Sequence, residues 1–229
     1  MSDATMAALD PVTIAIALME AESTSGAEGP AIAAVERLLA DRGWETTRIP
    51  VSDGRDDVFA RAPGASPLVT LSTHLDTVPP YIAPRLDGGR LLGRGSCDAK
   101  GIAAAMICAA ERLRARGVPI ALLFVVGEET AHDGAHAAND AQPLLAPENR
   151  VLINGEPTES VLGTGTKGAL RFTLRTAGRA AHSAYPHLGE SATSKLVRLL
   201  GELDGLTLPT DPVLGDTTVN IGHLAGGVA

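Results

Sequence analysis

The sequence predicts an α/β protein in which a mostly parallel sheet is flanked by helices and is followed by a smaller α+β part. Short apolar runs alternate with segments of helical periodicity, and connections of that length imply parallel pairing of the strands. Hydrophobic residues make up 45% of the 229 residues, whereas aromatic residues make up only 3%. The core must therefore consist of Ala, Val, Leu and Ile, as in sheets that are buried on both faces.

The first elements along the chain are two helices and three strands. Residues 11–22 and residues 29–41 repeat apolar side chains at helical spacing, and Gly43 follows the second segment as a stop signal. Apolar or β-branched runs then predict strands at residues 44–51, 57–62 and 67–73. The last of these is nearly continuous in its apolar character, which is typical of a strand at the centre of a sheet.

The longest predicted helix covers residues 98–116. Its expected core face consists of Ile102, Met106, Ala109 and Leu113, and Gly117 and Pro119 end it. Two further buried strands are expected at residues 120–126 and 150–153.

The pattern changes after Thr158. Residues 169–176 alternate apolar and polar side chains, which predicts a half-exposed strand of an antiparallel sheet. Residues 191–206 predict an amphipathic helix, and residues 217–224 a further strand. We therefore expect a boundary within residues 163–168, so that residues 1–162 form one part and residues 163–229 a second part.

Charge and cysteine content exclude several classes of protein. The formal net charge is −8, which argues against nucleic-acid binding, because that function requires clustered Lys and Arg. The apolar run 12–19 is too short to span a membrane, and no basic residue precedes Arg37, so no signal peptide is expected. Cys97 and Cys108 fit reduced thiols better than a disulfide framework. These observations predict a cytoplasmic protein.

One histidine and five carboxylates lie at or just after the ends of the predicted strands or at the start of the long helix. They are His74, Asp76, Asp98, Glu128, Glu129 and Glu156. In an open α/β sheet, ligands gather outside the carboxyl ends of the strands. So many carboxylates can share one edge only if cations hold them or several are protonated. One imidazole among hard oxygen ligands suits Zn²⁺ or a similar divalent ion, so the pattern indicates a metallohydrolase.

Each of these residues also has a simpler interpretation. A lone His-x-Asp pair is usually a buried histidine satisfied by its neighbour, with Asp76 as the hydrogen-bond partner of His74. Asp98 fits the N-cap of a helix, Glu128 and Glu129 fit a solvated loop, and Glu156 fits a loop acid before a proline. The combination favours the metal site. There, one of the two adjacent glutamates can bind metal while the other accepts a proton.

Three other motifs are rejected. Gly163-x-Gly165-x-x-Gly168 fits the dinucleotide-binding pattern, but a predicted strand follows it instead of a helix. Gly93-x-Gly95 lacks the third glycine. His132 and His136 are spaced as on one helix face, but the His-Glu-x-x-His motif is absent, so we interpret them as surface residues.

Five ordered segments resemble the co-catalytic zinc hydrolases that include acetylornithine deacetylase, succinyl-diaminopimelate desuccinylase, aminoacylase and carboxypeptidase G. These segments are residues 72–79, 93–101, 127–129, 154–158 and 181–183. The resemblance covers most of the chain. It implies a catalytic domain in residues 1–162 and the first part of an inserted dimerisation (lid) domain in residues 163–229.

The resemblance also implies roles for individual residues. Asp98 bridges two Zn²⁺ ions, with Co²⁺ or Mn²⁺ as possible substitutes; His74 and Glu156 complete one site, and Glu129 serves the other. Glu128 is the general base, and Asp76 orients His74. His182 stabilises the oxyanion in the active site of the partner subunit of a homodimer. A cis peptide bond is implied after Asp98.

The implied activity is hydrolysis of an amide bond in an N-acyl amino acid, as in acetylornithine deacetylase. A metal-dependent dipeptidase or carboxypeptidase acting on short peptides is the second interpretation, because the same chemistry serves both. Members of the family run well beyond 229 residues, so the resemblance implies that both domains are incomplete and that the last histidine ligand of the second metal is missing. His223 is not assigned to that place. An inactive, truncated or degenerate metal-binding protein is therefore the third interpretation.

Overall fold

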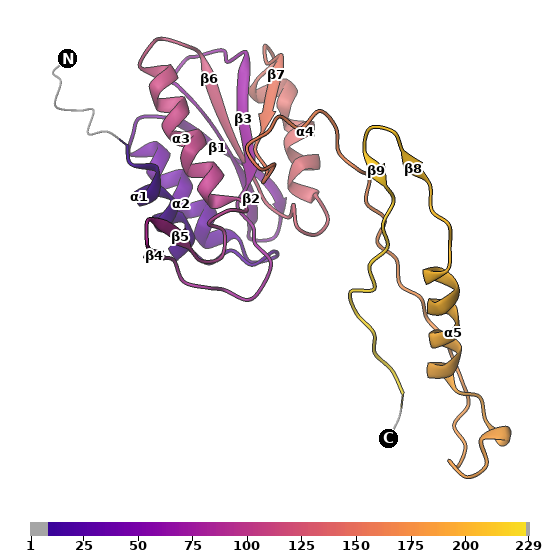
Figure 1. The fold of residues 1–229 in the computed structure, drawn as a ribbon. Coiled ribbons are helices and arrows are strands. Elements are labelled where there is room, and N and C mark those ends of the chain that lie inside the picture. Colours follow the sequence, from indigo (N-terminus) through magenta and orange to yellow (C-terminus); the bar gives the residue numbers. More distant parts are fainter. Residues whose placement is uncertain (1–8, 228–229) are drawn as a thin grey trace. The chain divides into compact units, whose positions relative to one another are not determined.

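The fold is that of a computed structural model, which describes residues 9–227 (Figure 1). The chain divides into two compact units, one ending at Ser160 and the other beginning at Val161.

A five-stranded sheet with the order β1-β2-β6-β3-β7 forms the centre of the first unit. Its strands are β1 (Glu45–Ser52), β2 (Arg55–Arg61), β3 (Val69–His74), β6 (Ile120–Val125) and β7 (Val151–Asn154). β3 pairs in parallel with both β6 and β7, whereas β1 and β2 continue the sheet in antiparallel fashion. Helical crossovers separate the parallel strands, as parallel pairing requires.

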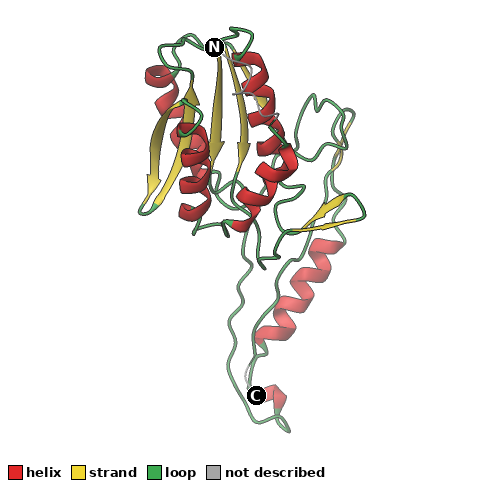
Figure 2. Cartoon of the chain, turned by 90° about the vertical axis from the view of Figure 1, so that its left-hand side faces the viewer, coloured by secondary structure: helices red, strands yellow, loops and turns green. Residues whose placement is uncertain are grey.

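Helices cover the two faces of this sheet unequally (Figure 2). The main core lies under three helices: α1 (Pro11–Glu20), α2 (Gly29–Ala40) and α3 (Lys100–Arg114). A smaller apolar cluster lies on the other face under α4 (Asp133–Leu145), where Ala138 meets Ile49 and Phe59. A short hairpin of β4 (Arg85–Asp87) and β5 (Arg90–Leu92) turns at Gly88 and Gly89. The predicted α/β class with helices on both faces is confirmed.

The predicted core face of α3 is partly confirmed, because Met106 and Leu113 are partly buried and pack against the main core. Ala109 is exposed, and the buried positions are instead Ala103, Ala104, Ile107 and Ala110, together with Cys108 and Lys100. The small alanine side chains allow the helix to pack close to the sheet, so the buried face is marked by small residues more than by large ones.

The single tryptophan of the chain, Trp44, is buried at the start of β1. Its indole N–H donates a hydrogen bond of 2.9 Å to Glu111 of α3. The guanidinium of Arg114 lies 4.9 Å from the ring centroid, within cation–π range. These contacts connect the first strand of the sheet to the last turns of α3.

Helix α4 is not among the helices predicted from the sequence. Pro143 lies inside this helix and has no backbone N–H to donate, and the helix begins after His132, whose φ is 54°. Alanines supply most of its buried contacts. Weak apolar periodicity and an internal proline both argue against a helix at the level of sequence.

The second unit contains α5 (Ala192–Asp204), a 3₁₀ helix at Pro186–Leu188, and a hairpin of β8 (Thr210–Asp211) and β9 (Gly215–Asp216). The predicted amphipathic helix is confirmed as α5, and Ser191 caps it by accepting a hydrogen bond from the Ser194 amide. The strands predicted at 169–176 and 217–224 are wrong as paired strands, because the structure has no ladder for them. The alternation of side chains is present there, but a strand also requires a hydrogen-bonded neighbour.

Within residues 9–227, no helix is long and apolar enough to cross a membrane.

Candidate metal centre

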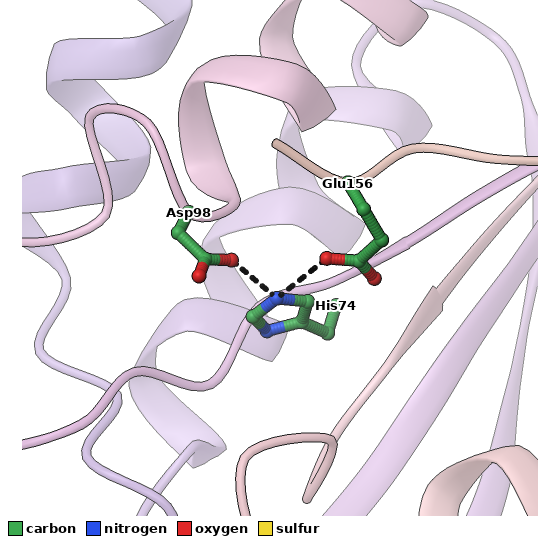
Figure 3. A group of neighbouring side chains, drawn as sticks. All are labelled: His74, Asp98 and Glu156. Carbon is green, nitrogen blue, oxygen red and sulfur yellow. Dashed lines mark hydrogen bonds and ion pairs between the residues drawn. The ribbon is translucent and has the colours of Figure 1, made fainter. Parts of the chain in front are cut away.

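His74, Asp98 and Glu156 come together at the carboxyl edge of the parallel strands (Figure 3). His74 is the last residue of β3 and is buried. Its Nε2 atom lies 2.8 Å from Oδ1 of Asp98 and 3.7 Å from Oε2 of Glu156. One ligand atom from each of the three side chains lies within 4.8 Å of the others. An imidazole nitrogen and two carboxylate oxygens are a donor set suited to a divalent cation such as Zn²⁺.

The register of the sheet brings Glu156 to this edge. β3 and β7 pair in parallel, with Ser72 opposite Asn154. Just beyond β7, the Gly155 amide donates to the carbonyl of Ser72 at 2.8 Å, and the Thr73 hydroxyl donates to the carbonyl of Gly155 at 2.7 Å. The chain therefore stays attached to β3 up to the residue before Glu156, and this attachment directs Glu156 toward His74.

Asp98 lies in the segment that leads into α3. The N-cap position of that helix is Ala99 and no side chain caps it, so the simpler interpretation of Asp98 as an N-cap is wrong. The peptide bond between Asp98 and Ala99 is cis, as the resemblance implied. Lys100, which follows, is buried and donates to the carbonyl of Ala21 at 2.6 Å. Burial lowers the pKa of this lysine to about 8, although Glu22 nearby raises it.

Asp76 is fully buried and holds two parts of the site at once. Nδ1 of His74 lies 3.0 Å from the carbonyl of Asp76 and 3.4 Å from its carboxylate. The same carboxylate accepts hydrogen bonds of 3.1 Å from the amides of Glu128 and Glu129, and one of 2.7 Å from the Ser25 hydroxyl. Burial raises the pKa of Asp76, but the hydrogen bonds from His74, Ser25 and the two amides outweigh it, so the pKa is lowered.

The carboxylates around His74 favour positive charge at its ring. Burial lowers the pKa of His74, but Asp76, Glu156 and Asp98 together raise it to about 11. A group whose charged form is favoured this strongly inside a protein is surrounded by uncompensated negative charge. A divalent cation bound between Asp98 and Glu156 would supply the same compensation, so the residues present fit the metal that the sequence predicts.

Glu128 and Glu129 follow β6 in a loop that begins at Gly127, and both are partly exposed. Oε1 of Glu128 lies 3.8 Å from Nδ1 of His132. The pKa of Glu129 is raised, first by burial and then by the charge of Asp98. Among residues 9–227, however, the group with converging ligand atoms contains His74, Asp98 and Glu156 and not Glu129. A role for Glu129 as a ligand remains a prediction.

His182 belongs to the second unit. Its Nδ1 accepts a hydrogen bond of 3.1 Å from the Ala184 amide, and its ring centroid lies 5.8 Å from that of Tyr185. Its predicted role in stabilising an oxyanion remains a prediction.

Ser25 is a residue of the site that was not predicted from the sequence; its hydroxyl donates a hydrogen bond to Asp76 across 51 positions of the chain. Two further contacts attach this segment to the residues that follow β3. Thr24 forms an isolated bridge with Thr77, and the Ser23 hydroxyl donates to the carbonyl of Leu75. Ser-Gly sequences are common in loops, so nothing in the local pattern distinguishes Ser25 from a turn residue.

Gly101→Ala should weaken both folding and metal binding. A β-carbon at Gly101, in the first turn of α3, would overlap the carbonyl oxygen of Ser96, and that overlap would displace the segment that carries Asp98. Overpacking of this kind costs about 1–3 kcal/mol. We expect a melting temperature lower by several degrees and a weaker Zn²⁺ affinity by titration calorimetry. Gly201→Ala in α5 is the matched control, because nothing lies within 4 Å there; equal losses in both variants would contradict the prediction.

Asp57 should make the protein less stable at alkaline pH. Burial raises the pKa of this carboxyl to about 7, the Val126 amide and Arg55 oppose the rise, and Asp133 and Asp56 add to it. Within the described part of the chain, Oδ2 of Asp57 has no hydrogen-bond partner. In the unfolded chain the pKa of an aspartate is about 3.9. The folded protein therefore keeps a proton that the unfolded chain releases. The resulting stabilisation is complete below about pH 4 and is lost as pH rises through about 7.

Melting temperatures of the metal-free protein at about pH 5 and about pH 8 test this dependence. The decline should be smaller in Asp57→Asn than in the wild type. Asp140→Asn is the control, since Asp140 is an exposed residue of α4 and is not among the charges that shift the pKa of Asp57. The prediction fails if Asp57→Asn and the wild type decline equally.

Comparison with known proteins supports the resemblance found in the sequence. The family described as Peptidase family M20/M25/M40 matches residues 70–222. A protein of Aspergillus fumigatus named "Probable carboxypeptidase" is 41% identical over 247 residues, and the alignment covers 93% of this chain and 56% of that protein. One of Aspergillus terreus with the same name is 42% identical over 237 residues, covering 93% and 55%. The chain thus spans about half the length of the curated relatives it matches.

Solved structures show the same fold. A tripeptidase from Staphylococcus aureus is similar with a TM-score of 0.61 at 19% identity, covering 96% of this chain and 61% of that one. An M20 family metallo-carboxypeptidase from Sulfolobus solfataricus has a TM-score of 0.51 at 19% identity, covering 63% and 37%. Because the family match extends over residues 70–222 and includes His74, Asp98, Glu128, Glu129 and Glu156, the chain belongs to peptidase family M20/M25/M40.

Proposed function

We propose that the protein is a metal-dependent hydrolase that cleaves a peptide or amide bond of a small substrate. The observation that carries this proposal is the convergence of His74, Asp98 and Glu156 at the sheet edge of a chain in a peptidase family. The cluster combines a buried imidazole with two partly exposed carboxylates, whose side chains are 48% and 35% exposed for Asp98 and Glu156. The exposure of the two carboxylates leaves the site open to a small substrate, and their negative charge favours the binding of a cation.

Two Zn²⁺ ions are the proposed cofactor, with Co²⁺ or Mn²⁺ as substitutes. His74 and Glu156 would hold one ion, Glu129 would hold the other, and Asp98 would take part in holding both. When bound, such ions lower the pKa of a water molecule and polarise the substrate carbonyl. Asp76 fixes the ring of His74 from the opposite side, at Nδ1, and leaves Nε2 directed at Asp98.

Glu128 is the proposed general base. Its carboxylate would accept a proton from the attacking water and then donate that proton to the leaving amine. The backbone amide of Glu128 is bonded to Asp76, so the base and His74 share one buried anchor. His182, supplied by the lid domain of a partner subunit, is proposed to stabilise the oxyanion.

The substrate class has two candidates. Removal of the C-terminal residue from a short peptide is the first, because relatives of about 41% identity are named probable carboxypeptidases. Deacylation of an N-acyl amino acid is the second, since the motifs resemble those of acetylornithine deacetylase. Both substrates present a scissile amide next to a free carboxylate, and the same base and metal centre would serve both.

A substrate panel distinguishes these candidates. The purified, Zn²⁺-loaded protein is assayed with N-acetyl amino acids, dipeptides and N-blocked dipeptides, with Glu128→Gln as the blank. Higher kcat/KM on blocked dipeptides supports the carboxypeptidase, and higher kcat/KM on N-acetyl amino acids supports the deacylase. No turnover of any of these, with metal bound, would support a protein that binds metal without catalysis and would refute the proposed function.

We also propose a domain organisation, a homodimer and a cellular location. Residues 1–162 would belong to the catalytic domain and residues 163–229 to a lid domain through which two subunits form a homodimer. Light scattering coupled to size-exclusion chromatography measures that stoichiometry. A cytoplasmic location is proposed from Cys97 and Cys108, which are both free thiols.

A further inference from the structure

Arg55 connects the carboxylates of Glu28 and Asp133. Its guanidinium lies against Gly127, at the start of the loop that carries Glu128 and Glu129. Its Nε and Nη2 atoms each bond to one oxygen of Glu28, both at 2.9 Å. On the other side, its Nη2 lies 3.2 Å from Oδ1 of Asp133, and its Nη1 bonds to Oδ2 of the same residue. Arg55 therefore bonds to both oxygens of both carboxylates, an arrangement that lysine cannot reproduce.

This network is buried on one side. The side chain of Glu28 is 0% exposed and that of Arg55 is 14% exposed. A buried ion pair is a poor source of stability, because removing the charges from water costs about as much as their attraction returns. The network is therefore better explained by what it holds in place than by its contribution to the free energy of unfolding.

It contacts the loop directly. Asp133 is the first residue of α4 and ends the connection that starts at Gly127. A β-carbon at Gly127 would overlap both the Asp133 carboxylate and the Arg55 guanidinium, so the network packs against the residue immediately before Glu128. The carbonyl of Gly127 also accepts the amide of His132 at 2.8 Å, which closes the loop on itself.

The loop is thus supported from two sides, and both supports start from one segment. Ser25 bonds to Asp76, which in turn accepts the amides of Glu128 and Glu129. Glu28, three residues further along, bonds to Arg55 and through it to Asp133. The connection between α1 and α2 therefore fixes both the start and the end of the loop.

We infer that Arg55 is a positioning residue: with Glu28 and Asp133 it holds residues 127–132 in the arrangement that directs the carboxylates of Glu128 and Glu129 into the site. The inference rests on the proposed function for the roles of these two glutamates. It assigns no contact between Arg55 and substrate. A shift of about 1 Å in a reacting group costs about 100-fold in rate, so such a support has a large effect on turnover.

Arg48 offers a matched control. It also connects two carboxylates, with Nη2 2.7 Å from Glu36 and Nη1 3.1 Å from Asp56. Its side chain is 41% exposed, its partners lie on α2 and β2, and neither of these bonds involves residues 127–132. Arg48→Met removes a similar pair of bonds without touching the loop.

The first readout needs no activity. Amide hydrogen exchange is measured on the metal-free full chain of the wild type, Arg55→Met and Arg48→Met. We expect the amides of residues 127–132 to exchange about tenfold faster in Arg55→Met, those of β3 and β6 to stay protected, and Arg48→Met to match the wild type. Unchanged loop exchange in a folded Arg55→Met would overturn the inference.

The second readout is steady-state kinetics on the substrate identified by the panel. We expect kcat of Arg55→Met to fall at least about tenfold with KM changed less than about twofold. Arg55→Lys should recover the melting temperature but not kcat, because a lysine cannot bond both carboxylates through four oxygens. A rise in KM with unchanged kcat would contradict the inference.

Asp133→Asn covers the case in which Arg55→Met does not fold. It weakens only the link to the loop and leaves the pair of Arg55 and Glu28 intact. Loop exchange as slow as in the wild type would then refute the inference. Full turnover by Glu128→Gln would refute the role proposed for Glu128 instead, and absence of turnover in the wild type would refute the proposed function; in either case the exchange experiment would still report whether Arg55 holds the loop.

Discussion

Glu128→Gln should lower kcat by about 10²- to 10⁴-fold while the metal content stays unchanged. Glutamine keeps the size of the side chain. The backbone N–H of residue 128 still donates to Asp76, so the loop should retain its position. What the variant loses is a group that can accept and return a proton. Stopped assays on the panel substrate, with elemental analysis of the same sample, measure both quantities.

Glu148→Gln is the control for this variant, because Glu148 is an exposed residue beyond α4 whose carboxylate pairs with Arg150. It should leave kcat within about twofold of the wild type. If Glu128→Gln also stayed within that range, the base would have to be assigned elsewhere, and Glu129 would be the next residue to replace.

His74→Ala should release the metal. His74 supplies the one nitrogen among the three converging side chains, and its removal would leave Asp98 and Glu156 without the imidazole that both approach. Loss of a residue that merely orients a ligand costs about 10- to 100-fold in metal affinity, so loss of the ligand itself should exceed that. Zinc per purified chain, measured by elemental analysis, should be lower in His74→Ala than in the wild type.

His136→Ala is the matched control, because His136 is exposed on α4 and lies outside the group of converging side chains. It should keep the wild-type zinc content. One weakly held ion in the wild type would mean that only one of the two proposed metal sites forms in this chain. Zinc retained by His74→Ala would refute the assignment of His74 as a ligand.

Much of the first unit could be predicted from local pattern. β3 and β6 are short apolar runs between helical segments, and the rule that ligands gather at the carboxyl ends of parallel strands led to His74 and Glu156. The structure brings these two residues and Asp98 together. Local pattern was sufficient here, because each of these residues lies within a few positions of a strand or helix end.

Other features depend on partners that are far away in the sequence. Arg55 bonds to Asp133 across 78 positions, and nothing in the sequence around either residue indicates the pairing. The segments 169–176 and 217–224 have the alternation of strands but no ladder partner in the structure, since pairing is decided by neighbours and not by propensity. On α3, the choice of buried face depended on how closely the helix approaches the sheet.

The environment of Trp44 gives the molecule an internal optical reporter. This residue is the only tryptophan in the sequence, and its indole is held between Glu111 and Arg114 in the core of the first unit. Its emission therefore changes when the sheet and α3 separate, and does not register unfolding of α5. Denaturation followed by tryptophan fluorescence reads the first unit alone, whereas circular dichroism reads the helices of both units. The two signals together measure the stability of each unit within one unmodified chain.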